Sequence, residues 1–343
     1  VPNILLSTTR MWNPGDDFIA FGVRHLLEEI FPRFNPIAYN RNPELHLQRT
    51  RYNSLQYTHP KIDKPFKIDL LPYLEKTLMQ YDNSWRPSFG LDSIDYCLFA
   101  GSPEWYGRMH TPLTTLLENS DIPVAYLGIG SHEGIANHKY EQFSQIDRKL
   151  LERSTLITVR DSLLQNILSP ASPLLLPCPA LFSAKNAQHR QPQKRLRIAL
   201  STQPCRRMQS LHSEKNLTFS LNLFKELAKR HDCEIICHYI DEIPPIKDFG
   251  LPIRFSYDPR DYEQIYNEFD LTVTTRVHGA GLCASLGVPG YIFSHSTRSD
   301  TGKGFLSEVI DVNNETVDGV LNRIETFDVS ARSAQLIKHK EIY

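Results

Sequence analysis

The residues best suited to chemistry lie in one segment, Thr274-Thr275-Arg276-Val277-His278-Gly279-Ala280-Gly281. Arg276 and His278 are two positions apart, so at an extended strand end their side chains would point to the same side. Arginine suits bidentate recognition of a carboxylate or phosphate, and histidine exchanges a proton near neutral pH. The small residues from Gly279 onward would let a ligand approach the start of a helix. The segment therefore predicts an anion site with an acid–base group, and the alternative is a buried structural histidine.

A second candidate anion site is the segment Asn13-Pro14-Gly15-Asp16, which lies between a predicted strand and a predicted helix. Such a turn places the first free amides of the helix where they can hold an anion or a polarised oxygen. The alternative is structural, because Asp16 is a good helix N-cap and Gly15 a good turn residue. The segment alone leaves both interpretations open.

A third candidate is Arg160, which follows the predicted strand 156–159. We expect it to face a cleft between two domains, while Asp161 or Ser162 caps the helix that follows. The alternative is a surface pair between Arg160 and Asp161.

Residues for binding an acceptor are expected on two loops. His132 follows Gly128-Ile129-Gly130, a strand end whose bare Gly-x-Gly is not a dinucleotide-binding fingerprint. A stretch without acidic residues carries the basic residues Lys185, Arg190, Lys194, Arg195, Arg197, Arg206 and Arg207. A solvated linker face is the default interpretation of such a run. Arg206 and Arg207 should lie in the loop after a strand, at the cleft, where they would meet an anionic acceptor.

The elements that must position these residues follow an α/β pattern, in which short apolar runs alternate with helical periodicity. Strands are predicted at 4–7, 94–99, 124–127, 156–159, 196–201, 233–239, 271–274 and 290–293. Helices are predicted at 16–30, 111–119, 138–153, 214–230, 259–268 and 280–286, with further helix in 315–340. Continuous apolar strands indicate parallel sheets covered by helices on both faces. We expect two doubly wound domains whose strand ends face a common cleft.

The polar segment 183–194 is predicted to be the linker between these domains. We expect a first domain at 1–185, a second at 186–325, and a C-terminal helix at 326–343 that packs back on the first. Residues 40–90 are rich in aromatic residues and too long for a simple loop. They are expected to form either a helical insertion packed on the domain or a lid that stacks on a sugar.

Composition excludes several classes of protein. The 343 residues carry 38 basic and 39 acidic side chains, and this near-neutral balance argues against binding of duplex nucleic acid. No apolar run is long enough to span a bilayer. The six cysteines are scattered without a Cys-x-x-Cys pair, which argues against a zinc ribbon. Cys233 and Cys237 are expected to be small buried residues on one face of a strand. A reducing, cytoplasmic location is expected.

Taken in order, these motifs resemble those of the polysaccharide pyruvyl transferase family. The resemblance is carried by Asn13-Pro14-Gly15-Asp16, Gly128-Ile129-Gly130, Arg160-Asp161, Thr275-Arg276-Val277-His278-Gly279 and Gly287-Val288-Pro289. Two departures are Cys178-Pro179-Ala180, where the family often has Asp-Pro-Ala, and Ser131, where proline is common.

The resemblance implies two Rossmann-like domains in a GT-B-like arrangement. It also implies transfer of a pyruvyl group from phosphoenolpyruvate to two hydroxyls of a sugar or lipid-linked oligosaccharide, without a metal or organic cofactor. The donor would be bound by Arg160, Arg276, Gly279, Asn13, Gly15 and Asp16. His278 would be the general acid, and then the base, with Arg276 as its catalytic partner. Peripheral contact with a membrane is an accompanying expectation.

Two alternatives remain open. One is a GT-B glycosyltransferase that uses a nucleotide sugar, although no segment strongly predicts a pocket for a base and ribose. The other is a catalytically silent carbohydrate-binding relative.

Overall fold

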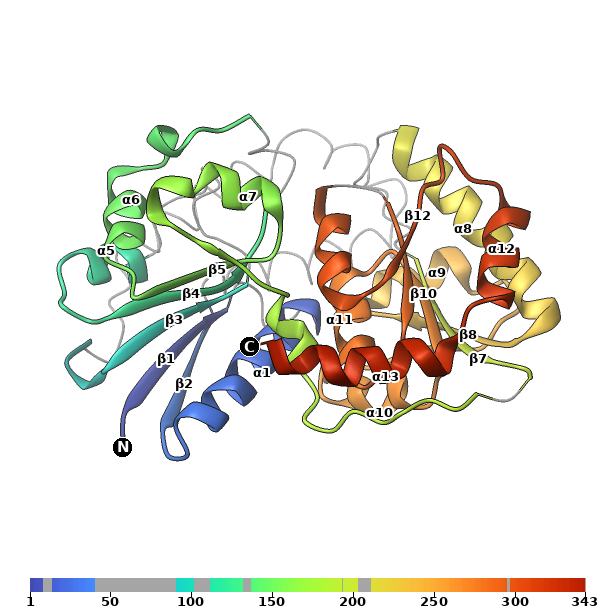
Figure 1. Cartoon of the computed structure of the whole chain (residues 1–343), viewed down its shortest axis with the longest axis horizontal. Coiled ribbons are helices and arrows are strands. Elements are labelled where there is room, and N and C mark those ends of the chain that lie inside the picture. Colours follow the sequence, from blue (N-terminus) through green and yellow to red (C-terminus); the bar gives the residue numbers. More distant parts are fainter. Residues whose placement is uncertain are drawn as a thin grey trace, which may run out of the picture.

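The computed structural model describes residues 1–8, 14–40, 91–101, 112–131, 137–192, 194–202, 211–294 and 297–342. They form two lobes, each built on a parallel sheet flanked by helices (Figure 1). The α/β class expected from the sequence is therefore confirmed.

The sheet of the first lobe has the strand order β2-β1-β3-β4-β5-β6, and all its pairings are parallel. Its strands are β1 (Asn3–Thr8), β2 (Asn35–Asn40), β3 (Tyr96–Ala100), β4 (Val124–Ile129), β5 (Leu156–Val159) and β6 (Leu174–Leu175). The accompanying α-helices are α1 (Pro14–Ile30), α5 (Pro112–Glu118), α6 (Gln145–Glu152) and α7 (Ser162–Ile167).

The central strands of this sheet are buried on both faces. Leu5, Phe99 and Tyr126 share one core with the apolar residues of α5, α6 and α7. Residues that alternate with them, such as Leu6, pack with α1 on the other face. Burial on both faces explains why these strands read as continuous apolar runs in the sequence.

The sheet of the second lobe has the order β12-β11-β10-β7-β8-β9 and is also parallel. Its strands are β7 (Arg197–Ser201), β8 (Asp232–Cys237), β9 (Ile253–Phe255), β10 (Leu271–Thr274), β11 (Gly290–Phe293) and β12 (Glu308–Ile310). The helices are α8 (Leu211–Arg230), α9 (Ile243–Ile246), α10 (Asp261–Asn267), α11 (Val277–Ser285), α12 (Val317–Glu325) and α13 (Val329–His339). In the centre of this sheet Thr274 of β10 lies opposite Ser201 of β7.

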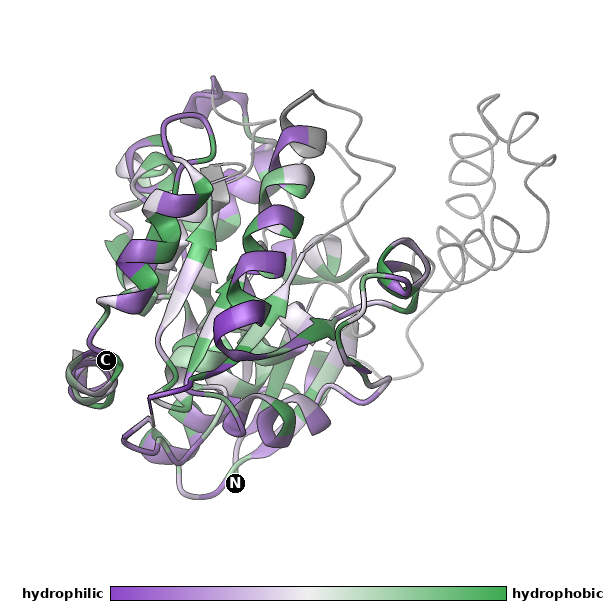
Figure 2. Cartoon of the chain, turned by 90° about the vertical axis from the view of Figure 1, so that its right-hand side faces the viewer, coloured by the Kyte–Doolittle hydropathy of each residue, from purple (hydrophilic) through white to green (hydrophobic). Residues whose placement is uncertain are grey.

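Short 3-10 helices complete the described chain. They are η1 (Leu91–Ser93), η3 (Tyr140–Gln142), η4 (Ser169–Ala171), η5 (Pro179–Phe182), η6 (Ile240–Glu242), η7 (Thr297–Phe305) and η8 (Lys340–Ile342). Figure 2 shows hydrophilic and hydrophobic residues interleaved along the helices, while the strands between them are mostly hydrophobic. Among the described residues, no helix combines the length and the apolar character needed to cross a membrane.

The helices and strands predicted from the sequence agree best with the structure at the centres of the sheets. Strands β5, β10 and β11 have the predicted bounds. The single helix predicted over 138–153 is wrong, because Ser144 caps a new helix by accepting from the Asp147 amide, and η3 and α6 are separate. The outer strands β2, β6, β9 and β12 were not predicted, since short edge strands carry little apolar periodicity.

The two lobes meet in a shared apolar core made by α1, η5, α10 and α11. Phe18 of α1 is fully buried there and lies edge-on to Tyr262 of α10, with ring centroids 5.9 Å apart. Gly281 of α11 lies so close to η5 that a Cβ would come within 2.7 Å of the Cβ of Ala180. Gly22 of α1 likewise lies directly against the carbonyl oxygen of Pro179. The packing therefore fixes how the two sheets face each other.

The segment between the lobes is held in place from several sides, although its described residues from 183 to 196 form no helix or strand. Arg190 is buried and donates to the backbone carbonyls of Asn267 and Leu286. At the end of α13, Lys340 donates to the carbonyls of Ala184 and Ser285. In Figure 1, α13 runs from the second lobe toward the middle of the molecule.

Substitution of Gly22 by alanine should destabilise the protein by about 1–3 kcal/mol, the usual range for overpacking of a tight core. The added methyl group would overlap the Pro179 carbonyl and push α1 away from η5. Gly319→Ala in α12 is the matched control, expected to change stability by less than about 1 kcal/mol. Chemical denaturation measures both, and equal effects would contradict the close approach at Gly22.

Candidate functional site

The segment that carries Arg276 and His278 turns from strand into helix within three residues. β10 ends at Thr274, Arg276 is the N-cap of α11, and His278 lies in the first turn of that helix. The extended geometry expected for these two residues is therefore wrong. Their side chains have different partners, since His278 contacts the first lobe and Arg276 contacts its own lobe.

Arg160 and His278 meet across the junction of the two lobes. Arg160 follows β5, and its Nη1 lies 2.9 Å from His278 Nε2 and 3.7 Å from Cys178 Sγ. A guanidinium can only donate hydrogen bonds, so His278 Nε2 must be the acceptor. In this arrangement the imidazole is neutral and carries its proton on Nδ1.

The Arg160 side chain is buried without a carboxylate among the described residues. It is only 6% exposed, and its Nε has no described hydrogen-bond acceptor. The neighbouring Asp161 is engaged elsewhere, because its carboxylate accepts from the amides of Leu164 and Ser131. Asp161 thus caps α7 as expected, and the alternative of a surface pair is excluded. Burial of an unbalanced charge costs several kcal/mol, so the site is suited to an anion.

Small and hydroxyl residues lie at the carboxyl ends of the first sheet, on the same edge as this guanidinium. Gly130, after β4, lies directly against the Arg160 Nε, so that any Cβ there would collide with it. The hydroxyls of Thr8 and Ser131, which end β1 and follow β4, are buried without a described partner. Polar groups left unsatisfied in this way cost about 1–3 kcal/mol each, which is typical of functional sites.

Arg276 is held within the second lobe by residues that the sequence analysis missed. Its guanidinium forms an ion pair with Glu242, and these side chains are only 11% and 4% exposed. The guanidinium also lies 4.5 Å from the centroid of the Tyr239 ring. Glu242 accepts in turn from the amides of His238 and Tyr239. The charge of Arg276 is therefore balanced, unlike that of Arg160. The signal for this capping arrangement was a glutamate, Glu242, three residues after the helix N-cap Tyr239.

Gly279 lies over a second histidine that was not singled out from the sequence. A Cβ on Gly279 would lie 3.0 Å from His238 Cε1. His238 is buried, its Nε2 is 2.8 Å from the Tyr266 hydroxyl, and its ring packs edge-on to Phe18. Burial holds the pKa of His238 well below its ordinary value. The interpretation weighed for His278, a buried structural histidine, therefore fits His238.

The start of α1 differs from its predicted form. The helix begins at Pro14, so Gly15 and Asp16 lie buried inside its first turn, and Asp16 is not the N-cap. The next residue, Asp17, is also buried, and its Oδ2 has no described hydrogen-bond partner. Burial, followed by the charges of Asp16 and Asp258, raises the pKa of Asp17 to about 8. This effect outweighs the helix dipole, which favours a charged carboxylate at an N-terminus.

Four predicted site residues lie outside the described part of the chain: Asn13, His132, Arg206 and Arg207. Residues 41–90, which make up almost all of the predicted aromatic insertion, lie outside it as well. Their assigned roles stay predictions.

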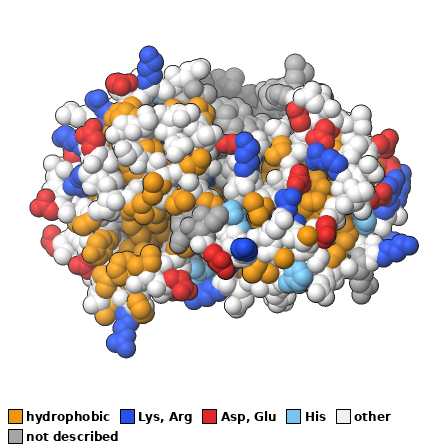
Figure 3. Space-filling view, in the orientation of Figure 1, with side chains coloured by type: hydrophobic (Ala, Val, Ile, Leu, Met, Phe, Trp, Pro, Cys, Tyr) orange, Lys and Arg blue, Asp and Glu red, His pale blue; other side chains and the backbone are white. Residues whose placement is uncertain are grey.

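Three described members of the basic stretch form ion pairs within the protein. Lys185 pairs with Glu28, Arg195 with Asp232 and Arg197 with Glu268. Figure 3 shows basic and acidic side chains interspersed over the visible face of both lobes. These residues fit the default interpretation of a solvated linker face.

Cys233 and Cys237 are buried in β8, as expected, and burial raises the pKa of each thiol to about 12. Such thiols are chemically inert at neutral pH. Within the described ranges, no three histidine, cysteine or acidic side chains come together in a group that could hold a metal ion.

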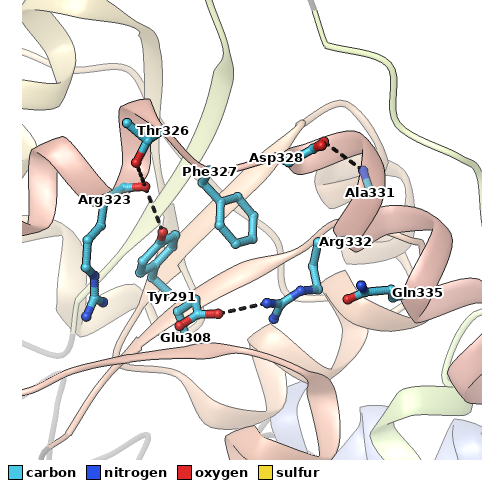
Figure 4. Close-up of a pocket in the computed structure, with 9 residues that line it drawn as sticks. All are labelled: Tyr291, Glu308, Arg323, Thr326, Phe327, Asp328, Ala331, Arg332 and Gln335. Atoms are coloured by element: carbon cyan, nitrogen blue, oxygen red, sulfur yellow. Dashed lines mark hydrogen bonds and ion pairs between the residues drawn. The ribbon is translucent and has the colours of Figure 1, made fainter.

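A cavity of about 390 Å³ lies between β11, β12, α12 and α13, at the amino ends of these strands and away from their carboxyl ends (Figure 4). Its arginines are already paired, Arg332 with Glu308 and Arg323 with Glu315. None of the predicted site residues lines it. The Arg160–His278 contact is therefore the better candidate for the reaction site.

Two facing parallel sheets joined in this way define a GT-B-like α/β protein, and solved structures share this fold. The chain is similar to the MnaA–UDP co-structure from S. aureus, with a TM-score of 0.58 and 11% identity over 98% of this chain and 91% of that one. It is also similar to the spinosyn rhamnosyltransferase SpnG, with a TM-score of 0.50 and 11% identity over 99% and 95% of the two chains. No curated protein sequence gives a significant match.

The model of one family, polysaccharide pyruvyl transferase, matches residues 13–297. The chain therefore belongs to the polysaccharide pyruvyl transferase family, and the resemblance noted in the sequence is confirmed. Membership identifies it as a transferase of polysaccharide biosynthesis, with a sugar acceptor and a small-molecule donor.

Replacing Asp17 by asparagine should remove a pH dependence of stability. The pKa of this carboxyl is about 8 in the folded protein against 3.8 for an ordinary aspartate, so folding retains a proton that unfolding releases. The stability of the wild type should therefore fall as the pH rises from about 4 to 8, by up to about 1.4 kcal/mol per pKa unit. Denaturation at pH 5, 6.5 and 8 should show that the free energy of unfolding of Asp17→Asn, relative to that of the wild type, increases with pH. Asp258→Asn should weaken the slope without abolishing it, and a parallel profile for Asp17→Asn and wild type would refute the assignment.

Proposed function

We propose that the protein transfers the pyruvyl group of phosphoenolpyruvate to two hydroxyls of a sugar, forming a cyclic ketal and releasing phosphate. The observation that supports this most directly is the buried Arg160 guanidinium, which lacks a described carboxylate and contacts His278. Phosphoenolpyruvate carries a carboxylate and a phosphate, and a planar guanidinium binds either in a bidentate manner. The acceptor is a sugar or a lipid-linked oligosaccharide of a cell-surface polysaccharide, and the reaction takes place in the cytoplasm.

The helix that follows Arg276 supports the same anion. α11 begins beside Arg160, and the free amides of its first turn carry partial positive charge. Arg276 contributes less net charge because Glu242 balances it. In this proposal Arg160 is the main anchor of the donor, and the start of α11 at Gly279 completes its site. Gly15 and Asp16, at the start of α1, remain candidate contacts.

His278 handles protons in the proposed reaction. Neutral His278 takes the proton of the first sugar hydroxyl as its oxygen attacks C2 of the donor. His278 then passes this proton to the methylene carbon of the donor, which becomes the methyl group, so the residue acts as base and then as acid. This order is the reverse of the one expected from the sequence, because the contact with Arg160 leaves the imidazole neutral. The bond between C2 and the phosphate oxygen breaks, the second hydroxyl attacks C2 to close the ketal, and its proton leaves with the phosphate. No step in this scheme uses a metal or an organic cofactor.

Donor binding tests the proposal directly. Calorimetry should show that phosphoenolpyruvate binds, while UDP-, GDP- and CMP-sugars do not. Arg160→Ala should weaken phosphoenolpyruvate binding about 10- to 100-fold, because a charge-assisted hydrogen-bonded pair contributes about 1.5–3 kcal/mol. Arg197→Ala, which removes an exposed and paired arginine, is the control and should bind as the wild type does. Preferential binding of a nucleotide sugar would favour the alternative of a glycosyltransferase.

Loss of the imidazole should slow turnover rather than weaken donor binding. His278→Ala should reduce kcat for phosphate release about 10²- to 10⁴-fold, the usual contribution of a general acid–base group. The phosphoenolpyruvate Kd should change far less, and the exposed His138→Ala should match the wild type. Phosphate release is measured across galactosyl, mannosyl and glucosaminyl acceptors. Undiminished turnover in His278→Ala would exclude this residue from proton transfer and favour a silent binding relative.

A further inference from the structure

Unsatisfied polar side chains also lie at the strand ends of the second lobe, beneath α8. Thr275 follows β10, and its amide donates to the carbonyl of Ser201 at the end of β7, at 3.0 Å. This bond extends the ladder between the two central strands by one residue beyond their paired ends. Val273 packs in the core that contains the apolar face of α8, and Thr275, two positions further on, continues that face.

The same face of α8 carries Asn216. One turn further along the helix, the Ser220 hydroxyl lies 3.3 Å from the hydroxyl of Thr202, which follows β7. Asn216 and Ser220 are four residues apart and so lie on one side of the helix. The topology therefore brings Asn216 and Thr275 to the same end of the β7–β10 pair.

Both side chains are buried without hydrogen bonds to any described residue. Asn216 is 5% exposed, and neither its Nδ2 nor its Oδ1 has a described partner. Thr275 is 6% exposed, and its Oγ1 is likewise unpartnered within the described ranges. Leucine and valine would fill such positions without this cost, since a buried amide that lacks partners is strongly unfavourable. Two such groups at one end of the sheet point to a ligand.

The chemistry of the two groups indicates which ligand. A hydroxyl and a carboxamide can each donate and accept, and neither carries charge. Such groups match the hydroxyls of a sugar ring, whereas a phosphate calls for cations such as Arg160. Thr275 also precedes His278 by three residues, so both belong to the segment that turns from β10 into α11.

We propose that Asn216 and Thr275 form a subsite of the second lobe that binds hydroxyls of the acceptor sugar. This inference rests on the proposed function for the identity of the sugar as acceptor. The donor anion binds on the first lobe at Arg160, the sugar binds on the second lobe, and His278 lies between them.

Two variants and a matched control test the subsite. Asn216→Leu and Thr275→Val should each raise the acceptor KM about 10-fold and leave the phosphoenolpyruvate Kd unchanged. Each should also keep or raise the melting temperature, because an unsatisfied polar group is removed. Thr272→Val is the control: this buried threonine of the same strand donates to the Ala199 carbonyl. It should lower the melting temperature and leave the acceptor KM unchanged.

Direct binding separates this inference from the proposed reaction. Methyl glycosides of galactose, mannose and N-acetylglucosamine serve as probes in ligand-observed NMR, without phosphoenolpyruvate. At least one should bind the wild type, and Asn216→Leu and Thr275→Val should weaken it about 10-fold. Equal binding by wild type and variants, or no binding of any glycoside by the wild type, would overturn the subsite even if phosphoenolpyruvate binds. If the wild type binds a glycoside but not phosphoenolpyruvate, and the two variants lose glycoside binding, the subsite is supported and the pyruvyl donor is rejected.

Discussion

The positive charge of Arg160, buried at the meeting point of the two sheets, is the constraint on which the rest of the site depends. A guanidinium that is 6% exposed is strongly unfavourable unless something balances it, and no described carboxylate does so. The fold maintains this arrangement from several sides. Gly130 leaves room for the guanidinium because it has no Cβ. The Asp161 carboxylate caps α7 and does not pair with Arg160. The shared core of α1, η5 and α11 positions His278 against the Arg160 guanidinium.

Arg160 differs from several other basic residues of the protein, whose charges are paired with carboxylates. Arg276 is paired with Glu242, and Lys185 with Glu28. Buried Arg190 also lacks a described carboxylate partner, but its Nη1 and Nη2 donate to the carbonyl oxygens of Asn267 and Leu286 and to the side-chain oxygen of Asn267. No described carboxylate balances Arg160, so its charge is available to an anionic ligand. In the proposed function the first lobe would bind the charged donor at Arg160, and the neutral groups beneath α8 would bind an uncharged sugar ring.

The sequence predicted the centre of the fold better than its edges, and it marked candidate site residues without predicting their contacts. The mostly buried strands β5 and β10 are four-residue segments of leucine and β-branched residues, whereas β6 is a two-residue edge strand with too few residues to show a pattern. The types of Arg160 and His278 marked them as candidates, but their meeting depends on how two lobes pack. Glu242 was missed for the same reason, because only the turn after β8 brings it to Arg276.

The Arg160–His278 hydrogen bond also implies an order of events in the proposed reaction. While Arg160 donates to Nε2 of His278, the lone pair of that nitrogen is occupied and cannot accept a proton from a sugar hydroxyl. An anionic donor competes for the guanidinium, because a charge-assisted bond to a carboxylate or phosphate is stronger than one to a neutral imidazole. Donor binding would then release Nε2, so the histidine becomes a base only once phosphoenolpyruvate is in place. The contact between Arg160 and His278 would thus keep an acceptor inactive until the donor has arrived.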